Sequence, residues 1–105
     1  MALQGELILS NGIDMTSAYI VISDLDFHTT PNDTVYVDVA VLIYKDQTSK
    51  SVGKPEVVSF IHRCSGTDFS DYFSDSIFDA GGTNMRKQAY IFLKTLATYQ
   101  NFIDV

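Results

Sequence analysis

The most regular pattern in the chain is the alternation of side chains between Thr34 and Tyr44. Valine or isoleucine occupies every second position from Val35 to Ile43, and the intervening positions are also mostly apolar: Tyr36, Asp38, Ala40, Leu42 and Tyr44. Successive side chains of a strand point to opposite faces, so this segment predicts a central strand with two largely apolar faces. We expect a helix to cover one face and a partner to cover the other.

Three further segments predict strands that pair with this one. They are Gln4–Ser10, the β-branched and aromatic run that begins at Ala18 and continues to His28, and Glu56–Cys64. The dipeptide Asn11-Gly12 is typical of a type I′ hairpin turn, and residues 29–33, which contain Pro31, predict a second hairpin. The segment from Asp46 to Lys54 predicts a loop.

The last part of the chain predicts helices. Thr67 is expected to cap a short acidic helix, which would place four carboxylates on one face: Asp68, Asp71, Asp75 and Asp79. After Gly81-Gly82, the segment from Thr83 to Val105 predicts one amphipathic helix, whose apolar side closes the sheet as a lid through Ala89, Phe92, Leu93 and Leu96. The expected fold is therefore α+β: an antiparallel sheet of about four strands in two hairpins, a short acidic helix, and a C-terminal helix on one sheet face.

Composition and charge narrow the classes of partner. The 105 residues carry a net charge of -6, and the seven basic residues are scattered along the chain. Affinity for nucleic acid requires clustered basic side chains, so we expect no nucleic-acid binding and take protein partners as the default. The apolar runs are too short for a bilayer, so no membrane association is expected. The length predicts a single α+β domain over residues 1–105.

Two groups of side chains suggest a metal site. Asp24, Asp26 and His28 share one face of a strand, but they are spaced about 6.6 Å apart, which is wide for one ion. A polar strand end is the simpler interpretation, and ion binding stays open. The acidic helix lacks the central glycine and terminal glutamate of a calcium loop, so its carboxylates are interpreted as a solvated face.

One pair of residues suggests a nucleophile. His62 and Cys64 lie two apart in a strand, as a thiolate and its base would, but their apolar neighbours favour a buried, unreactive thiol. No phosphate-binding, dinucleotide or hydrolase motif accompanies them. We therefore expect no catalytic residues, no cofactor and no metal, and a protein that is not an enzyme. Candidate interface residues are the tyrosines expected to be partly exposed and the residues of two loops: Asn11, Gly12, Tyr19, Tyr36, Tyr44 and Lys50.

In the order of its features the chain resembles a group of short structural proteins of tailed bacteriophages. The resemblance covers nearly the whole chain and rests on Asn11-Gly12 followed by Ala18-Tyr19-Ile20, on the segment 37–45, on Cys64–Phe69 with Tyr72-Phe73-Ser74, and above all on Gln88–Leu96 with Phe102 and Asp104-Val105. It implies a non-enzymatic virion component, made in the host cytoplasm, in the tail baseplate or fibre-attachment region. It also implies virion proteins as partners and several copies, or a homo-oligomer, in each particle.

Two other placements are compatible with the same residues. One is a capsid decoration or head–tail protein, which differs only in its position in the particle. The other is a small non-virion acidic module that binds a cationic protein. An enzyme that uses Asp24, Asp26 and His28, or the His62 and Cys64 pair, is the third alternative.

Overall fold

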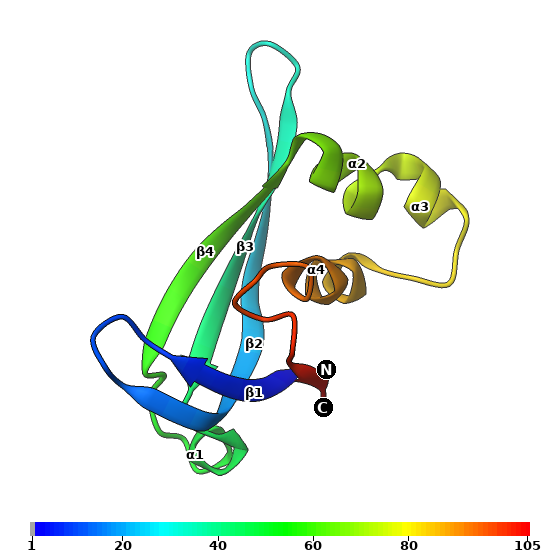
Figure 1. Cartoon of the computed structure of the whole chain (residues 1–105). Helices are drawn as coiled ribbons and strands as arrows, with labels where there is room; N and C mark the ends of the chain where they lie inside the picture. The colour runs from blue at the N-terminus through cyan, green and yellow to red at the C-terminus, as the bar shows by residue number, and fades with distance from the viewer. Residues whose placement is uncertain (1) are drawn as a thin grey trace.

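In the computed structural model, which describes residues 2–105, the chain forms a five-stranded antiparallel sheet with three of its helices on one face and a short helix at one end (Figure 1). The strands lie in the order β4-β3-β2-β1-β5 and are β1 (Leu3–Ile8), β2 (Asp14–Thr29), β3 (Val35–Tyr44), β4 (Val58–Ser65) and β5 (Ile103–Asp104). The predicted α+β class and antiparallel sheet are confirmed. The sheet has five strands where about four were expected, because the C-terminal residues pair with β1.

Both long hairpins turn through loops of the same geometry. In the first, Leu9 N–H donates to the Ile13 carbonyl (2.8 Å) and Gly12 N–H donates to the Leu9 carbonyl (2.9 Å), so the loop has three residues. Gly12 has a positive φ of 88° and Asn11 does not, so the predicted type I′ turn at Asn11-Gly12 is wrong. The Asn11 side chain instead accepts a hydrogen bond from Ile13 N–H, which stabilises the longer loop. The second loop, 31–33, repeats this pattern with Asp33 at φ 60°.

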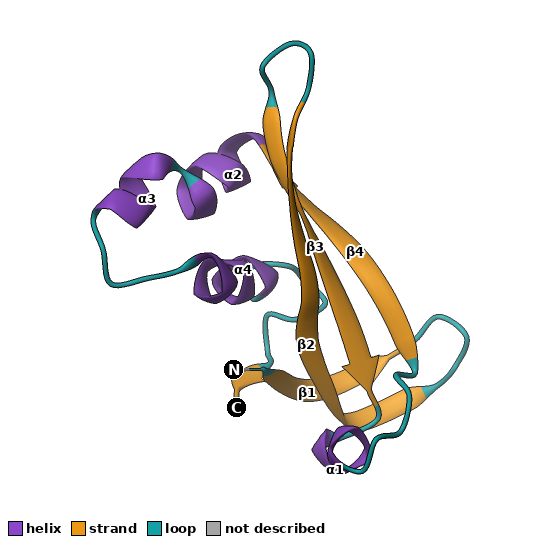
Figure 2. Ribbon diagram, turned by 180° about the vertical axis from the view of Figure 1, so that it is seen from behind, coloured by secondary structure: helices purple, strands orange, loops and turns teal. Residues whose placement is uncertain are grey.

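The core lies between the sheet and the helices on one side of it (Figure 2). The alternation predicted for the central strand places Val37, Val39, Val41 and Ile43 at zero exposure in β3. They belong to one cluster with Phe92 and Leu93 of α4 (Met85–Leu93) and Phe73 of α2 (Gly66–Phe73). This side of the sheet is here called the covered face.

A β-bulge in β2 is tied directly to α4. The pairing of β2 with β3 shifts register between Ile22 and Asp24, which leaves Ser23 as the extra residue. At this point Ile22 N–H donates to the hydroxyl of Tyr90 at 3.0 Å, and Tyr90 is only 1% exposed. The helix therefore supplies the hydrogen-bond partner of a buried strand amide.

The periodicity predicted one helix from Thr83 to Val105. The structure shows a shorter helix, α4, followed by turns. Asn84 caps α4 by accepting from Lys87 N–H, and α4 ends at Leu93. The chain then continues in turns whose amides donate to carbonyls three residues earlier, as Tyr99 does to Leu96 and Phe102 to Tyr99. A spacing of three keeps these residues on the sheet side, so the apolar pattern persists after the α-helix has ended.

The remaining helices also differ from the predictions. The acidic segment is divided at Ser74 into α2 and α3 (Asp75–Asp79), and α2 begins at Gly66, so Thr67 lies inside the helix rather than at its cap. The expected loop from Asp46 to Lys54 contains α1 (Gln47–Ser51), whose first turn is capped by the Asp46 carboxylate accepting from Ser49 N–H at 2.7 Å.

Candidate protein interaction surface

Within residues 2–105, the sheet face opposite α2 and α4 is covered by no helix except at one end, where α1 lies beside Tyr44 (Figures 1 and 2). We call it the open face. The register places on it, in β2, β3 and β4, Tyr19, Val21, Asp24, Asp26, His28, Tyr36, Asp38, Ala40, Leu42, Tyr44, Ser59, Ile61 and Arg63. Several residues of this set are half-buried, among them Val21, Tyr36 and Leu42.

The middle of the open face is apolar and slightly hollowed. Ala40, Leu42 and Ile61 lie there beside the small side chains of Ser23 and Ser59, around a shallow hollow of about 480 Å³. Ile61 is 71% exposed, the highest value among the large apolar residues that the structure describes. Burial of such a surface by a partner would be favourable, because apolar area removed from water contributes about 25 cal/mol per Å².

One end of the open face carries a stacked network across three strands. Arg63 donates to both carboxylate oxygens of Asp38, from Nε at 3.0 Å and from Nη2 at 3.3 Å. The guanidinium carbon lies 4.1 Å from the ring centroid of Tyr36, and Tyr36 stacks on His28 with ring centroids 4.9 Å apart. The guanidinium of Arg63 holds the pKa of Asp38 below its usual value. These rigid aromatic and charged groups form a preorganised surface.

The same end is acidic. Asp24 and Asp26 are exposed neighbours on β2, and the negative charge of Asp24 raises the pKa of Asp26 above its usual value. The opposite end of the face carries positive charge, where Lys50 Nζ of α1 lies 6.0 Å from the ring centroid of Tyr44. The open face is therefore electrically asymmetric along its strands.

The residues predicted for an interface divide between two places. Tyr19, Tyr36 and Tyr44 lie on the open face, and Lys50 adjoins Tyr44. Asn11 and Gly12 lie at the tip of the β1–β2 loop instead. Sequence reasoning missed Ile61 and Arg63, although the alternation of β4 could have indicated that both share a face with Ser59.

The predicted lid residues lie on the covered face. Ala89, Phe92 and Leu93 of α4 are at most 1% exposed. Leu96 packs against the same core but follows the end of α4 and is only partly buried.

The side chains considered for metal binding lie in two places, on the open face and on the helices α2 and α3. Asp24, Asp26 and His28 all face the open side, and the His28 Nε2 atom is 3.8 Å from a carboxylate oxygen of Asp38. Within residues 2–105, no three His, Cys, Asp or Glu side chains are grouped so that they could ligate one ion. Asp68, Asp71, Asp75 and Asp79 are exposed and belong to two separate helices.

His62 and Cys64 share a face but do not interact as a nucleophile and its base. The His62 Nε2 atom forms its hydrogen bond with the Tyr99 hydroxyl, at 2.8 Å. Burial raises the pKa of the fully enclosed Cys64 thiol to about 12, so the thiolate is strongly disfavoured. The arrangement is that of a buried core thiol.

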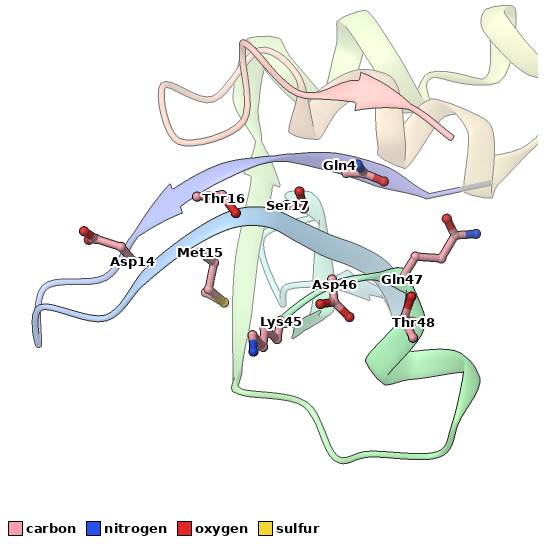
Figure 3. Close-up of a pocket in the computed structure, with 9 residues that line it drawn as sticks. All are labelled: Gln4, Asp14, Met15, Thr16, Ser17, Lys45, Asp46, Gln47 and Thr48. Atoms are coloured by element: carbon pink, nitrogen blue, oxygen red, sulfur yellow. The ribbon is translucent and has the colours of Figure 1, made fainter.

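A polar hollow of about 340 Å³ lies between the first hairpin and α1 (Figure 3). Its lining includes Gln4, Asp14, Lys45, Asp46 and Thr48. Figure 3 shows Asp14 and Lys45 directed away from one another, and the Asp46 carboxylate is occupied as the cap of α1. The hollow therefore lacks the convergent polar groups of an acid–base site.

No protein-family model, curated protein or solved structure matches this chain significantly. No helix in residues 2–105 is long and apolar enough to cross a membrane.

Proposed function

We propose that this protein is a non-enzymatic structural component of a tailed-phage virion, in the tail baseplate or fibre-attachment region, and that its open face docks on a larger virion protein. The open face is the observation that carries the proposal. It has an apolar centre and a rigid aromatic and charged border. Within residues 2–105, no helix covers that apolar centre.

The charge pattern of the open face defines the chemistry of the partner surface. Asp24 and Asp26 repel one another, as the raised pKa of Asp26 records, and neither has a basic side chain within salt-bridge distance in residues 2–105. A lysine or arginine of the partner placed against them would relieve this repulsion. The partner is therefore expected to present an apolar patch bordered by basic side chains.

The placement in a phage particle rests on the resemblance of the chain to short phage structural proteins. The residues that carry it are mostly architectural in the structure: Gln88–Leu96 spans most of α4 and the first turn after it, and Asp104-Val105 lies beside the N-terminal strand. These residues support a shared scaffold, and the open face supports the binding role.

Mass spectrometry of purified particles tests the placement. We expect the protein in particles at several copies each, and a cryo-EM map of the intact particle would locate it in the tail. Absence from the particle would overturn the virion proposal and leave the acidic binding module as the function. Density on the capsid or at the head–tail joint would move the protein to that alternative position.

A charge-reversed variant tests the open face. Asp24→Lys with Asp26→Lys should reduce incorporation into particles at least tenfold, because it places positive charge against a basic partner surface. The matched control is Asp68→Lys with Asp71→Lys, which reverses two exposed charges on α2, away from the open face. Equal incorporation of the two variants would show that the open face is not the docking surface.

A further inference from the structure

The outer edge of β4 is a long strand edge without the usual protection. β4 pairs only with β3, through eight residue pairs without a register shift. Within residues 2–105, no backbone hydrogen bond joins Val58–Ser65 to anything beyond this ladder. The opposite edge of the sheet is the two-residue β5, whose Asp104 is paired with Lys94. Alternate amides and carbonyls along about 26 Å of β4 are thus left for another strand.

Each face of this edge carries one large exposed apolar side chain. Ile61 on the open face is 71% exposed, and Phe60 on the covered face is 40% exposed, as is the adjoining Val57 at 41%. β4 contains no lysine, no proline and no bulge, and the guanidinium of its only arginine, Arg63, is engaged by Asp38. Natural sheets use such charges, prolines and bulges to prevent pairing with another chain, and their absence favours pairing.

We infer that β4 pairs antiparallel with β4 of a second copy of this chain, with the two-fold axis passing beside Ile61, so that one sheet runs through both copies. This inference does not depend on the virion proposal, because it concerns the isolated protein. A second copy is the partner that fits, since an antiparallel strand edge is complementary to itself under a two-fold rotation.

Symmetry restricts the possible registers, and the charge of Arg63 disfavours one of them. An axis perpendicular to the sheet keeps each face continuous, so residues of the same face must oppose one another, and a slip of one residue is excluded. With the axis at Ile61, the two Ile61 side chains meet, Phe60 opposes His62 of the second copy, and Ser59 opposes Arg63 of the second copy. An axis at Arg63 would place two guanidinium groups against each other, which is unfavourable.

The covered face beside this edge has room for the added side chains. A hollow of about 210 Å³ lies there, bounded by Leu7 and Leu9 of the first hairpin and by Phe60, His62 and Tyr99. In the proposed register, Phe60 of the second copy would lie next to His62, at the border of this hollow. The added strand would then cover apolar side chains on both faces of the sheet.

Light scattering coupled to size exclusion tests the oligomeric state. We expect a dimer of twice the 11.7 kDa chain mass for the unaltered protein. Ile61→Lys should give a monomer with an unchanged melting temperature at low concentration, because the side chain is mostly exposed within one copy. Val52→Lys is the matched control: Val52 is 65% exposed but follows α1, so this variant should remain a dimer. A monomeric unaltered protein, or a dimeric Ile61→Lys variant, overturns the inference.

Cysteine cross-linking tests the register in a Cys64→Ala background. Residues opposite one another in an antiparallel pair have Cα atoms about 4.5–5.5 Å apart, within the range of a disulfide. Ile61→Cys should therefore form a covalent dimer on mild oxidation, whereas Ser59→Cys alone should not. A mixture of Ser59→Cys and Arg63→Cys chains should cross-link as a heterodimer. Failure of Ile61→Cys to cross-link in a dimeric sample overturns the proposed pairing.

The experiments on β4 pairing and those on the virion proposal can fail independently of one another. A monomer in solution that is present in particles overturns the β4 pairing alone. A cross-linked dimer that is absent from particles overturns the virion placement alone.

Discussion

The imidazole of His62 and the hydroxyl of Tyr99 share a hydrogen bond of 2.8 Å, which joins the edge strand β4 to the turns that follow α4. The rings meet edge to face, with centroids 5.2 Å apart, and Tyr99 in turn packs edge to face on Phe102. This contact connects residues 37 positions apart and holds the C-terminal segment against the covered face. It also gives the fold a titratable group in a partly buried position.

The stability of the fold should depend on the protonation of His62. Burial lowers its pKa below the ordinary value of about 6.5, so the folded state favours the neutral imidazole. The associated stability is fully present above pH 6.5 and is lost as the pH falls through the folded-state pKa, because the unfolded chain then binds the proton more readily. Melting temperatures measured between pH 8 and pH 5 should show this decline.

His62→Gln should make that decline shallower, because the glutamine side chain does not titrate in this pH range. The same slope in the unaltered protein and in His62→Gln would show that other groups govern the acid sensitivity.

Removal of the Tyr90 hydroxyl should destabilise the bulge in β2. Tyr90→Phe keeps the ring in the core but leaves the buried Ile22 amide without its partner, which costs about 1–3 kcal/mol. Urea denaturation measures the difference in the free energy of unfolding, when both proteins are fitted with the same dependence of that free energy on urea concentration. Tyr72→Phe is a suitable control, because the Tyr72 ring also packs beside α4 and its side chain makes no hydrogen bond within residues 2–105.

The absence of a side chain at Gly5 is required by Phe102. A Cβ atom at residue 5 would lie 2.6 Å from Cδ1 and 2.8 Å from Cγ of the Phe102 ring, which is itself only 4% exposed. Gly5→Ala should therefore cost about 1–3 kcal/mol, the usual range for overpacking a core.

The cost of Gly5→Ala should fall when Phe102 is shortened to leucine in the same chain. A double-mutant cycle on the free energy of unfolding measures this coupling. Additive effects of the two substitutions would contradict the contact.

Two of the four predicted lid residues, Phe92 and Leu96, should differ in their contribution to stability. Phe92 is 1% exposed inside α4, so Phe92→Ala should cost about 3–5 kcal/mol. Leu96 is only partly buried in the following turn, so Leu96→Ala should cost less, about 2 kcal/mol. Ile91→Ala, at a residue 40% exposed on the outer side of α4, provides the baseline. A Phe92→Ala melting temperature within two degrees of the unaltered protein would show that α4 does not close the core.

Much of the architecture follows from local periodicity. The alternation through β3 separated its two faces but did not show which one the helices cover, and Val35, at one end of the covered face, is 39% exposed. The spacing of Ala89, Phe92 and Leu93 identified the buried side of α4. Both patterns are local consequences of strand and helix geometry, so they can be read from the chain itself. The end of α4 could not be predicted from the sequence, because apolar residues spaced three apart suit a helix and a series of tight turns equally well.

The composition of the open face depended more heavily on how the strands pair in three dimensions. The sequence indicated a second apolar sheet face and named Tyr19, Tyr36 and Tyr44 as interface candidates. Strand register placed all three on the open face, with Tyr19 opposite Tyr44 at one end and Tyr36 at the other. Register also joined Arg63 to Asp38 and Tyr36, and placed Ile61 at an unpaired edge. These relationships arise from strand order and strand register, which are long-range properties of the sheet. Local sequence therefore determined which residues share a face of each element. Only the tertiary structure decided which face of the sheet the helices cover and which exposed residues form one surface.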